Sequence, residues 1–145
     1  MKPEVIDAEH FDLGIDGTGV AQKVIESADG LVHRIEMLGS KLLYATQQPI
    51  QEGTYNYCAA DGCAIGDGTP LIEVVEPQPH LVAHAAEIMG AASADAASIE
   101  YLVDADTGEP CFYDFNPYSN FITGYDEELG FNPTDRYIDA LLASC

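Results

Sequence analysis

Three side chains that carry oxygen donors, Glu100, Asp114 and Asn116, lie in the stretch IEYLVDADTGEPCFYDFNPYSNF, residues 99–121. The Asp-Thr-Gly segment at 106–108 is typical of a hairpin turn, because glycine supplies the positive φ that such a turn needs. In a hairpin symmetric about the threonine of this turn, Glu100 lies directly opposite Asp114. Asn116 then shares a face with Asp114, since side chains alternate along a strand. The spacing therefore predicts that three oxygen donors converge on one patch.

Such a patch has a specific chemical use. Two like charges that face each other across a strand pair destabilise the pair. A divalent cation between Glu100 and Asp114 would remove that repulsion, and Mg²⁺ binds carboxylate and amide oxygens. The other interpretation is an exposed acidic hairpin on a very acidic protein. The spacing leaves both interpretations open.

The elements around the patch predict an α+β fold. Residues 1–19 show no clear period and are interpreted as a lead-in segment, and residues 20–145 as one domain. Residues 47–70 are rich in loop-forming residues. The order of elements favours an antiparallel β-sheet with helices packed on one face. The expected strands are Val20–Ile25, Leu31–Leu38, Lys41–Thr46, Leu71–Val75 and the two arms of the hairpin, and the expected helices are His80–Ala92 and Thr134–Leu142.

The charge of the chain restricts its partners. Its 145 residues include 25 Asp and Glu but only 5 Lys and Arg, for a net charge of −20. This balance argues against nucleic-acid binding through a basic surface and against anionic membrane surfaces. An excess of acidic residues is typical of proteins from a high-salt cytoplasm, where salt screens the repulsion. An ordinary acidic protein of low-salt cells is the alternative. No apolar run is long enough to span a membrane and no signal peptide begins at Met1, so we expect a cytoplasmic protein.

Other candidate residues favour structural roles. Cys58 and Cys63 in CAADGC resemble half of a zinc site, but no second Cys or His pair with ligand spacing accompanies them. His33 is expected to be a packed histidine on the face opposite Arg34. Lys41 and Arg34 are expected to form the one basic cluster, which would either face phosphates or pair with Glu36.

With these residues in view, the chain resembles the C-terminal catalytic region of ATP-grasp enzymes. In that family an acidic residue on one strand precedes an acid-x-Asn-Pro motif on the next, which here are Glu100 and the segment DFNP at 114–117. The run DGLVHRIEMLGSKLLYA resembles the strand pair that brings a basic residue to the nucleotide, and VAQKVIESADG resembles the segment that contacts adenine and ribose. CAADGC and the later GFNP are similar to a subgroup that includes the ribosomal-protein glutamate ligases.

The resemblance implies a ligase that binds ATP and Mg²⁺. Such enzymes phosphorylate a carboxylate to an acyl phosphate, which an amine or thiol then attacks. One or two Mg²⁺ ions, or Mn²⁺ in their place, would be held on the phosphates by Glu100, Asp114 and Asn116. Arg34 would be the catalytic residue that faces the phosphates or the acyl phosphate. The nucleotide would be bordered by Gln22, Lys23, Val24 and Ile25 at adenine, by Glu26 at the ribose and by Lys41.

The sequence also departs from the family pattern. The N-terminal lobe of ATP-grasp enzymes, with its lysine and its glycine-rich loop, has no counterpart in these residues, and Lys23 stands where many relatives carry an acid. The resemblance therefore implies a C-terminal half: a piece of a longer chain, one subunit of a split enzyme whose partner chain carries the lobe, or a remnant with a changed role. A homo-oligomer that covers the exposed sheet face is a further possibility. The alternative is a non-enzymatic scaffold or oligomerisation module with the same fold, which retains a divalent cation site.

Overall fold

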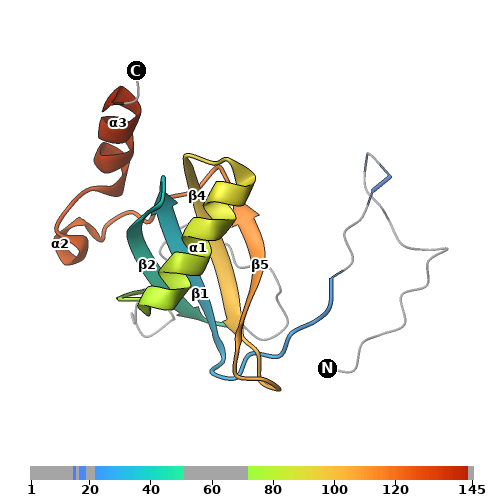
Figure 1. Cartoon of the computed structure of the whole chain (residues 1–145). Helices are drawn as coiled ribbons and strands as arrows, with labels where there is room; N and C mark the ends of the chain where they lie inside the picture. Colours follow the sequence, from blue (N-terminus) through green and yellow to red (C-terminus); the bar gives the residue numbers. More distant parts are fainter. Residues whose placement is uncertain (1–14, 16, 19–21, 51–71, 144–145) are drawn as a thin grey trace.

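The computed structural model describes residues 15, 17, 18, 22–50 and 72–143 (Figure 1). Most of the predicted lead-in segment, the CAADGC motif and most of the predicted loop at 47–70 lie outside these residues. In the described part, five strands and three helices form. They are β1 (Leu31–Leu38), β2 (Lys41–Pro49), β3 (Glu73–Val75), α1 (Pro79–Ala92), β4 (Ala96–Val103), β5 (Pro110–Asn116), α2 (Asp126–Leu129) and α3 (Pro133–Ala143).

The strands form one antiparallel sheet in the order β3-β2-β1-β4-β5. β1 is central and joins β2 through a two-residue turn, in which Gly39 has a φ of 59° that other residues rarely adopt. The backbone N–H of Gly39 also donates a hydrogen bond to the carbonyl of Asp95, which ties this turn to the start of β4 at 2.7 Å. β1 is therefore held on both sides along its length.

One face of the sheet is covered by α1, which lies across the strands in Figure 1. The helix contributes an apolar stripe with a spacing of four residues, and the strands contribute every second residue, as expected for the two periods. Together these side chains form the main core. Its buried members are Ile35, Met37, Ala45, Leu81, Ala85, Met89, Ala97, Ile99 and Tyr101.

The chain after β5 packs around a second, smaller core. Tyr44, Ile72 and Ile122 form its buried centre. The hydroxyl of Tyr44 accepts a hydrogen bond from the backbone N–H of Ile122 at 3.1 Å, so the segment after β5 is tied to β2. Beyond it, α3 stands past the end of the sheet in Figure 1, with the ring of Tyr137 5.6 Å from that of Phe121.

The predicted fold class is confirmed: the chain is α+β, with an antiparallel sheet and helices on one side. The predicted strand at Val20–Ile25 is wrong for its described residues, 22–25, which form no ladder. Pairing begins only at Ser27, which makes an isolated bridge with Asp104. The apolar side chains of this run line a cavity, described below, so a short apolar run did not indicate a strand here. No helix in the described part of the chain has the length and apolar character needed to cross a membrane.

Candidate functional site

The hairpin of β4 and β5 places Glu100 opposite Asp114, as the spacing predicts. The register reaches this pair through a bulge. Near the turn Tyr101 pairs with Phe112, and the next pair is Glu100 with Asp114, so Tyr113 is the extra residue. A bulge turns its side chains away from strict alternation. As a result, the Tyr113 hydroxyl reaches back and donates a hydrogen bond to Glu100 Oε2 at 2.8 Å.

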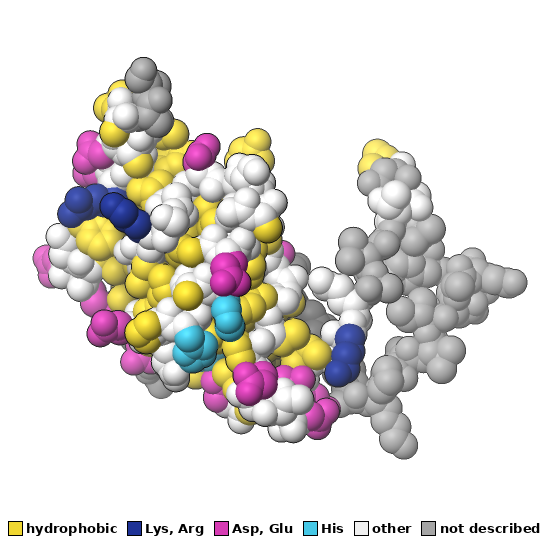
Figure 2. Space-filling view, viewed as in Figure 1, with side chains coloured by type: hydrophobic (Ala, Val, Ile, Leu, Met, Phe, Trp, Pro, Cys, Tyr) yellow, Lys and Arg dark blue, Asp and Glu magenta, His cyan; other side chains and the backbone are white. Residues whose placement is uncertain are grey.

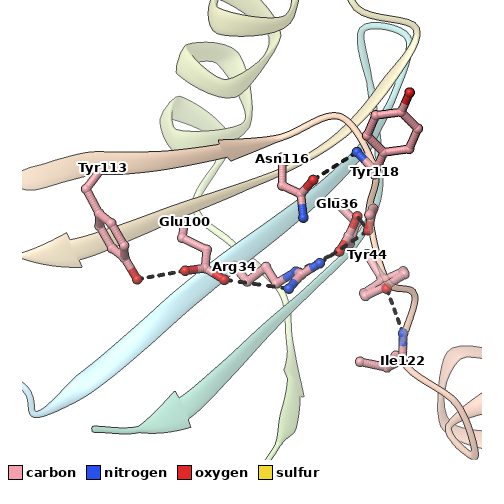
Figure 3. Close-up of polar contacts among 9 residues, drawn as sticks. Arg34, Glu36, Tyr44, Glu100, Tyr113, Asn116, Tyr118 and Ile122 are labelled. Atoms are coloured by element: carbon pink, nitrogen blue, oxygen red, sulfur yellow. Dashed lines mark hydrogen bonds and ion pairs between the residues drawn. The ribbon is translucent and has the colours of Figure 1, made fainter. Parts of the chain in front are cut away.

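Arg34 lies beside Glu100 on the neighbouring strand β1, and the two are paired in register. The contact between Arg34 Nη1 and Glu100 Oε1 is 3.6 Å, which is an ion pair but longer than a hydrogen bond. A much shorter contact joins Arg34 Nε to Glu36 Oε1, at 2.7 Å. Figure 3 shows these groups in a row from Tyr113 through Glu100 and Arg34 to Glu36. The guanidinium therefore lies between two carboxylates and is closer to one of them.

Glu36, which the sequence offers only as an ion-pair partner of the basic residues, forms that pair with Arg34 and lies within the site. Only 1% of it is exposed. Ser119, in the segment after β5, donates from its hydroxyl to Glu36 Oε2 at 2.5 Å and accepts from Arg34 Nη2 at 3.3 Å. The alternation of β1 puts Glu36 on the face of Arg34, so this part was visible in the sequence. The contribution of Ser119 depends on the path of a loop, which no periodicity predicts.

The electrostatics of the two buried carboxyls favour a further positive charge. Burial raises the pKa of Glu36, and the positive charge of Arg34 and the hydrogen bond from Ser119 oppose that rise. Burial also raises the pKa of Glu100, against the hydrogen bond from Tyr113 and the charge of Arg34, while the negative charges of Asp114 and Glu36 raise it further. The Arg34 guanidinium is thus shared by two carboxylates, and Asp114 adds a third negative charge beside Glu100, which a bound cation would balance.

The donor chemistry of this face fits a hard cation. Glu100 and Asp114 supply two carboxylates, and Asp114 is exposed to solvent. Asn116 uses its amide oxygen Oδ1 to accept the backbone N–H of Tyr118 at 2.9 Å, which fixes the side chain and leaves a second lone pair on that oxygen. No group of three His, Cys, Asp or Glu in the described residues is arranged to hold a metal. The third oxygen ligand of the predicted site is therefore an amide oxygen, that of Asn116, and not a third carboxylate.

A buried hydroxyl on the same face also lacks a partner. Ser98 is 1% exposed, and within the part of the chain that the structure describes its Oγ has no hydrogen-bond partner. In register it lies between Glu36 on β1 and Asn116 on β5. Buried hydroxyls are almost always paired, so Ser98 is an exception among the buried polar groups of this face.

A cavity of about 580 Å³ adjoins the carboxylates. It lies between the segment that precedes β1 and the strands β4 and β5. Tyr113 belongs to both places, because it lines the cavity and bonds Glu100. Its backbone carbonyl also accepts a hydrogen bond from the Gln22 amide at 3.4 Å. The lining residues are Gln22, Lys23, Val24, Ile25, Leu102, Cys111, Phe112 and Tyr113.

The structure brings most, but not all, of the predicted site residues together. The four residues predicted to border adenine line one cavity, whereas Glu26 is exposed and does not line it. The predicted basic cluster of Arg34 and Lys41 does not form. Arg34 pairs with Thr46, and Lys41 pairs with Leu38, which is four positions further along β1 and about 13 Å away at the usual rise of a strand. Lys41 is close to Arg34 in sequence. It follows the hairpin turn, however, and therefore lies beside the far end of β1.

The three histidines that the structure describes take structural positions. His33 stacks on Tyr101 with ring centroids 4.7 Å apart, and its Nε2 lies 2.8 Å from Asp29 Oδ2. It is the packed histidine that was predicted on the face opposite Arg34. His80 and His84 are exposed on α1, where Figure 2 shows histidine side chains on the molecular surface. Neither belongs to the carboxylate face.

Comparison with known proteins gives matches at the level of structure. No protein-family model matches the sequence, and neither does any curated protein. Among solved structures, the ATP-grasp ligase PsnB, complexed with a precursor variant, Mg and ADP, matches with a TM-score of 0.60 and 14% identity over 84% of this chain and 34% of its own. The macrocyclase MdnC from Microcystis aeruginosa, bound to precursor peptide MdnA, has a TM-score of 0.55 and 18% identity, over 83% of this chain and 35% of its own.

A third match is a RiPP-associated ATP-grasp ligase from Chryseobacterium gregarium in complex with ADP and a leader and core peptide. It has a TM-score of 0.55 and 16% identity over 86% of this chain and 36% of its own. The chain shares part of the ATP-grasp fold. It spans about a third of the length of these ligases. At these identities the similarity concerns the fold.

Proposed function

We propose that this chain is the ATP- and Mg²⁺-binding portion of an ATP-grasp ligase, which activates a carboxylate as an acyl phosphate for attack by an amine or thiol. The observation that carries the proposal is the position of Tyr113. This one residue lines a cavity large enough for a nucleotide base and also bonds the carboxylate that faces Asp114. A base and a phosphate-bound cation need such adjacent sites, and the fold is one that ATP-grasp ligases share.

In this proposal the chain's residues divide into two groups. The backbone and side chains of Gln22 to Ile25 hold adenine against Leu102 and Cys111 in the cavity. Glu100, Asp114 and Asn116 hold one or two Mg²⁺ ions, which when bound offset the charge that develops on the phosphates during transfer. Glu26 lies next to the cavity-lining run in sequence and contacts the ribose.

Arg34 supplies the positive charge that the chain itself brings to the phosphates or the acyl phosphate. Its planar guanidinium suits bidentate contact with phosphate oxygens. The substrates are a carboxylate, on a small molecule or on a peptide, and an amine or thiol. Because the chain spans about a third of the ligases it matches, the proposal includes a second lobe that completes the phosphate site.

The test is calorimetric titration of Mg·ATP into the chain, with and without a separately supplied ATP-grasp N-terminal lobe. Wild-type chain is expected to bind, more tightly with the lobe, and Asp114→Ala is expected to lose most of the binding. Asp106→Ala, which removes the same charge from an exposed turn residue, serves as the control. Absence of binding in both settings, or equal binding by the Asp114 and Asp106 variants, contradicts the proposal.

One observation favours the second candidate, a non-enzymatic scaffold. Arg34 already contacts two carboxylates and the hydroxyl of Ser119, so the network is complete as a tie between β1 and the segment after β5. In a scaffold of this kind, breaking the network would lower the melting temperature. Nucleotide would not bind and would leave the melting temperature unchanged. The same titration separates the two candidates.

A further inference from the structure

We propose that Glu36 is a positioning residue that anchors the Arg34 guanidinium and so keeps Glu100 open to a cation. The inference rests on the proposed function, because it concerns the cation site described there. The sequence offers Glu36 only as an ion-pair partner, with no role toward a cation. Its position and contacts carry the argument.

The distances show an unequal division of Arg34 between its two carboxylates. Arg34 Nε lies 2.7 Å from Glu36 Oε1, whereas Nη1 lies 3.6 Å from Glu100 Oε1. Charge-assisted hydrogen bonds between nitrogen and a carboxylate oxygen are about 2.7–2.9 Å long. The bond to Glu36 is therefore fully formed, and the contact with Glu100 is an electrostatic one.

Ser119 strengthens the preference of Arg34 for Glu36 over Glu100. Ser119 donates to Glu36 Oε2 and accepts from Arg34 Nη2, which closes a ring of three side chains. Figure 3 shows that Glu36 lies on the side of Arg34 that is turned away from Glu100. Glu36 is 1% exposed, so the carboxylate at the centre of the ring has little access to water. A buried anion of this kind is retained only with close partners.

The consequence for Glu100 follows from competition for one positive charge. If Glu36 loses its charge, the nearest remaining carboxylate for Arg34 is Glu100, which is already within ion-pair distance. A guanidinium that moves onto Glu100 occupies the oxygen that a cation needs. The arrangement in the structure avoids this, because Glu36 holds the guanidinium at a distance that leaves Glu100 Oε1 without a short bond to it. A purely structural tie between β1 and the segment after β5 would have no such effect on cation affinity.

The experiment uses the full chain and two readouts. The first is the Arg34 Nε–Hε signal in ¹⁵N NMR spectra, which reports its hydrogen bond without any cation present. We expect this signal to shift clearly in Glu36→Gln and to keep its position in Glu109→Gln, a matched change of an exposed glutamate. The same spectra show whether each variant remains folded.

The second readout is titration with Mn²⁺ alone, followed by paramagnetic broadening. Glu36→Gln is expected to weaken Mn²⁺ binding about tenfold, which is the size of one charge-assisted hydrogen bond. The double variant Arg34→Met/Glu36→Gln is expected to recover at least the wild-type affinity, because the competing guanidinium is gone. Recovery upon removal of a second residue is a result that simple loss of structure does not produce.

The outcomes separate the inference from the proposed function. An unchanged Arg34 signal in Glu36→Gln overturns the anchoring role. A shifted signal with wild-type Mn²⁺ affinity, or a loss of affinity that the double variant does not recover, shows that Glu36 is only a structural tie and overturns the inference. If the wild-type chain binds no Mn²⁺ while the signal shifts as expected, the cation site of the proposed function fails, and the part of the inference that concerns Glu100 fails with it.

Discussion

Glu100 lies directly opposite Asp114, although the turn that joins their strands is offset from the pair by a bulge at Tyr113. The bulge has a chemical consequence. It directs the Tyr113 hydroxyl to Glu100 while the rest of the residue lines the neighbouring cavity. A regular ladder would send the side chain of residue 113 to the face opposite its neighbours. The irregularity in the hairpin thus joins the cavity to the carboxylates.

Replacing Tyr113 with Phe tests this connection. The variant removes the hydroxyl that stabilises ionised Glu100, so the pKa of Glu100 is expected to rise further above its ordinary value. The loss of a hydrogen bond to a charged, largely buried group is expected to cost about 1.5 kcal/mol of unfolding free energy. Urea unfolding measures the stability, and carboxyl ¹³C titration measures the pKa. Tyr137→Phe, on α3, is the matched control and is expected to leave the pKa of Glu100 unchanged.

Cys111 provides a chemical probe of the cavity. It is a half-buried free thiol among the lining residues. In a variant in which Cys58, Cys63 and Cys145 are replaced by Ser, Mg·ATP is expected to slow the alkylation of Cys111 several-fold, because the base covers the thiol. Mg·tripolyphosphate, which has no base, is the control and is expected to leave the rate nearly unchanged. Mass spectrometry of the alkylated peptide measures both rates, and equal protection by the two ligands would place the base elsewhere.

The acidity of the chain predicts a strong dependence of stability on salt. With a net charge of −20, mutual repulsion opposes the compact state, and salt screens it. The melting temperature is expected to rise from low to molar KCl. A melting temperature that stays level or falls as KCl is added would contradict this prediction. If screening is the cause, potassium chloride and tetramethylammonium chloride should raise the melting temperature equally, because screening does not require a specific cation site.

Local patterns predicted much of this fold. The alternation of β1 placed His33 with the α1 core and Arg34 on the other face, and the hairpin spacing placed Glu100 opposite Asp114. These features depend on the two-residue period of a strand and on turn residues. Both are local patterns that can be recognised in a short stretch of sequence. The strand that was expected at Val20–Ile25 shows the limit of such reasoning. A short apolar run has no preference between a ladder and the wall of a cavity until its partners are placed.

The parts of the site that sequence did not predict depend on distant contacts. Ser119 reaches Glu36 across 83 positions of sequence, and the two-sided use of Tyr113 depends on a bulge. Lys41 was placed with Arg34 because the two lie close in sequence, but the hairpin carries them apart. Tertiary context decides such cases, because many loop paths satisfy the same local preferences.

The pH dependence of stability provides a test of the buried carboxyl of Glu36. Burial raises its pKa, so the folded state holds the proton more tightly than the unfolded state does. In the pH range that begins near the ordinary value of 4.5 and ends at the raised pKa, unfolding free energy therefore falls as pH rises, and it is level above that range. The charged or titratable groups that face Glu36 are Arg34 on β1, Tyr44 on β2 and Glu100 on β4.

Urea unfolding of wild-type chain and Glu36→Gln between pH 4.5 and 7.5 measures this effect. Because Glu100 also has a raised pKa, the variant is expected to keep a shallower decline with pH rather than a level curve. The difference in unfolding free energy between the wild-type chain and the variant is the contribution of Glu36. This contribution should become smaller as pH rises. Molar KCl reduces the general repulsion in both proteins equally and serves as the control. Parallel curves would mean that Glu36 has the same proton affinity in the folded and unfolded states, contrary to its burial beside Arg34.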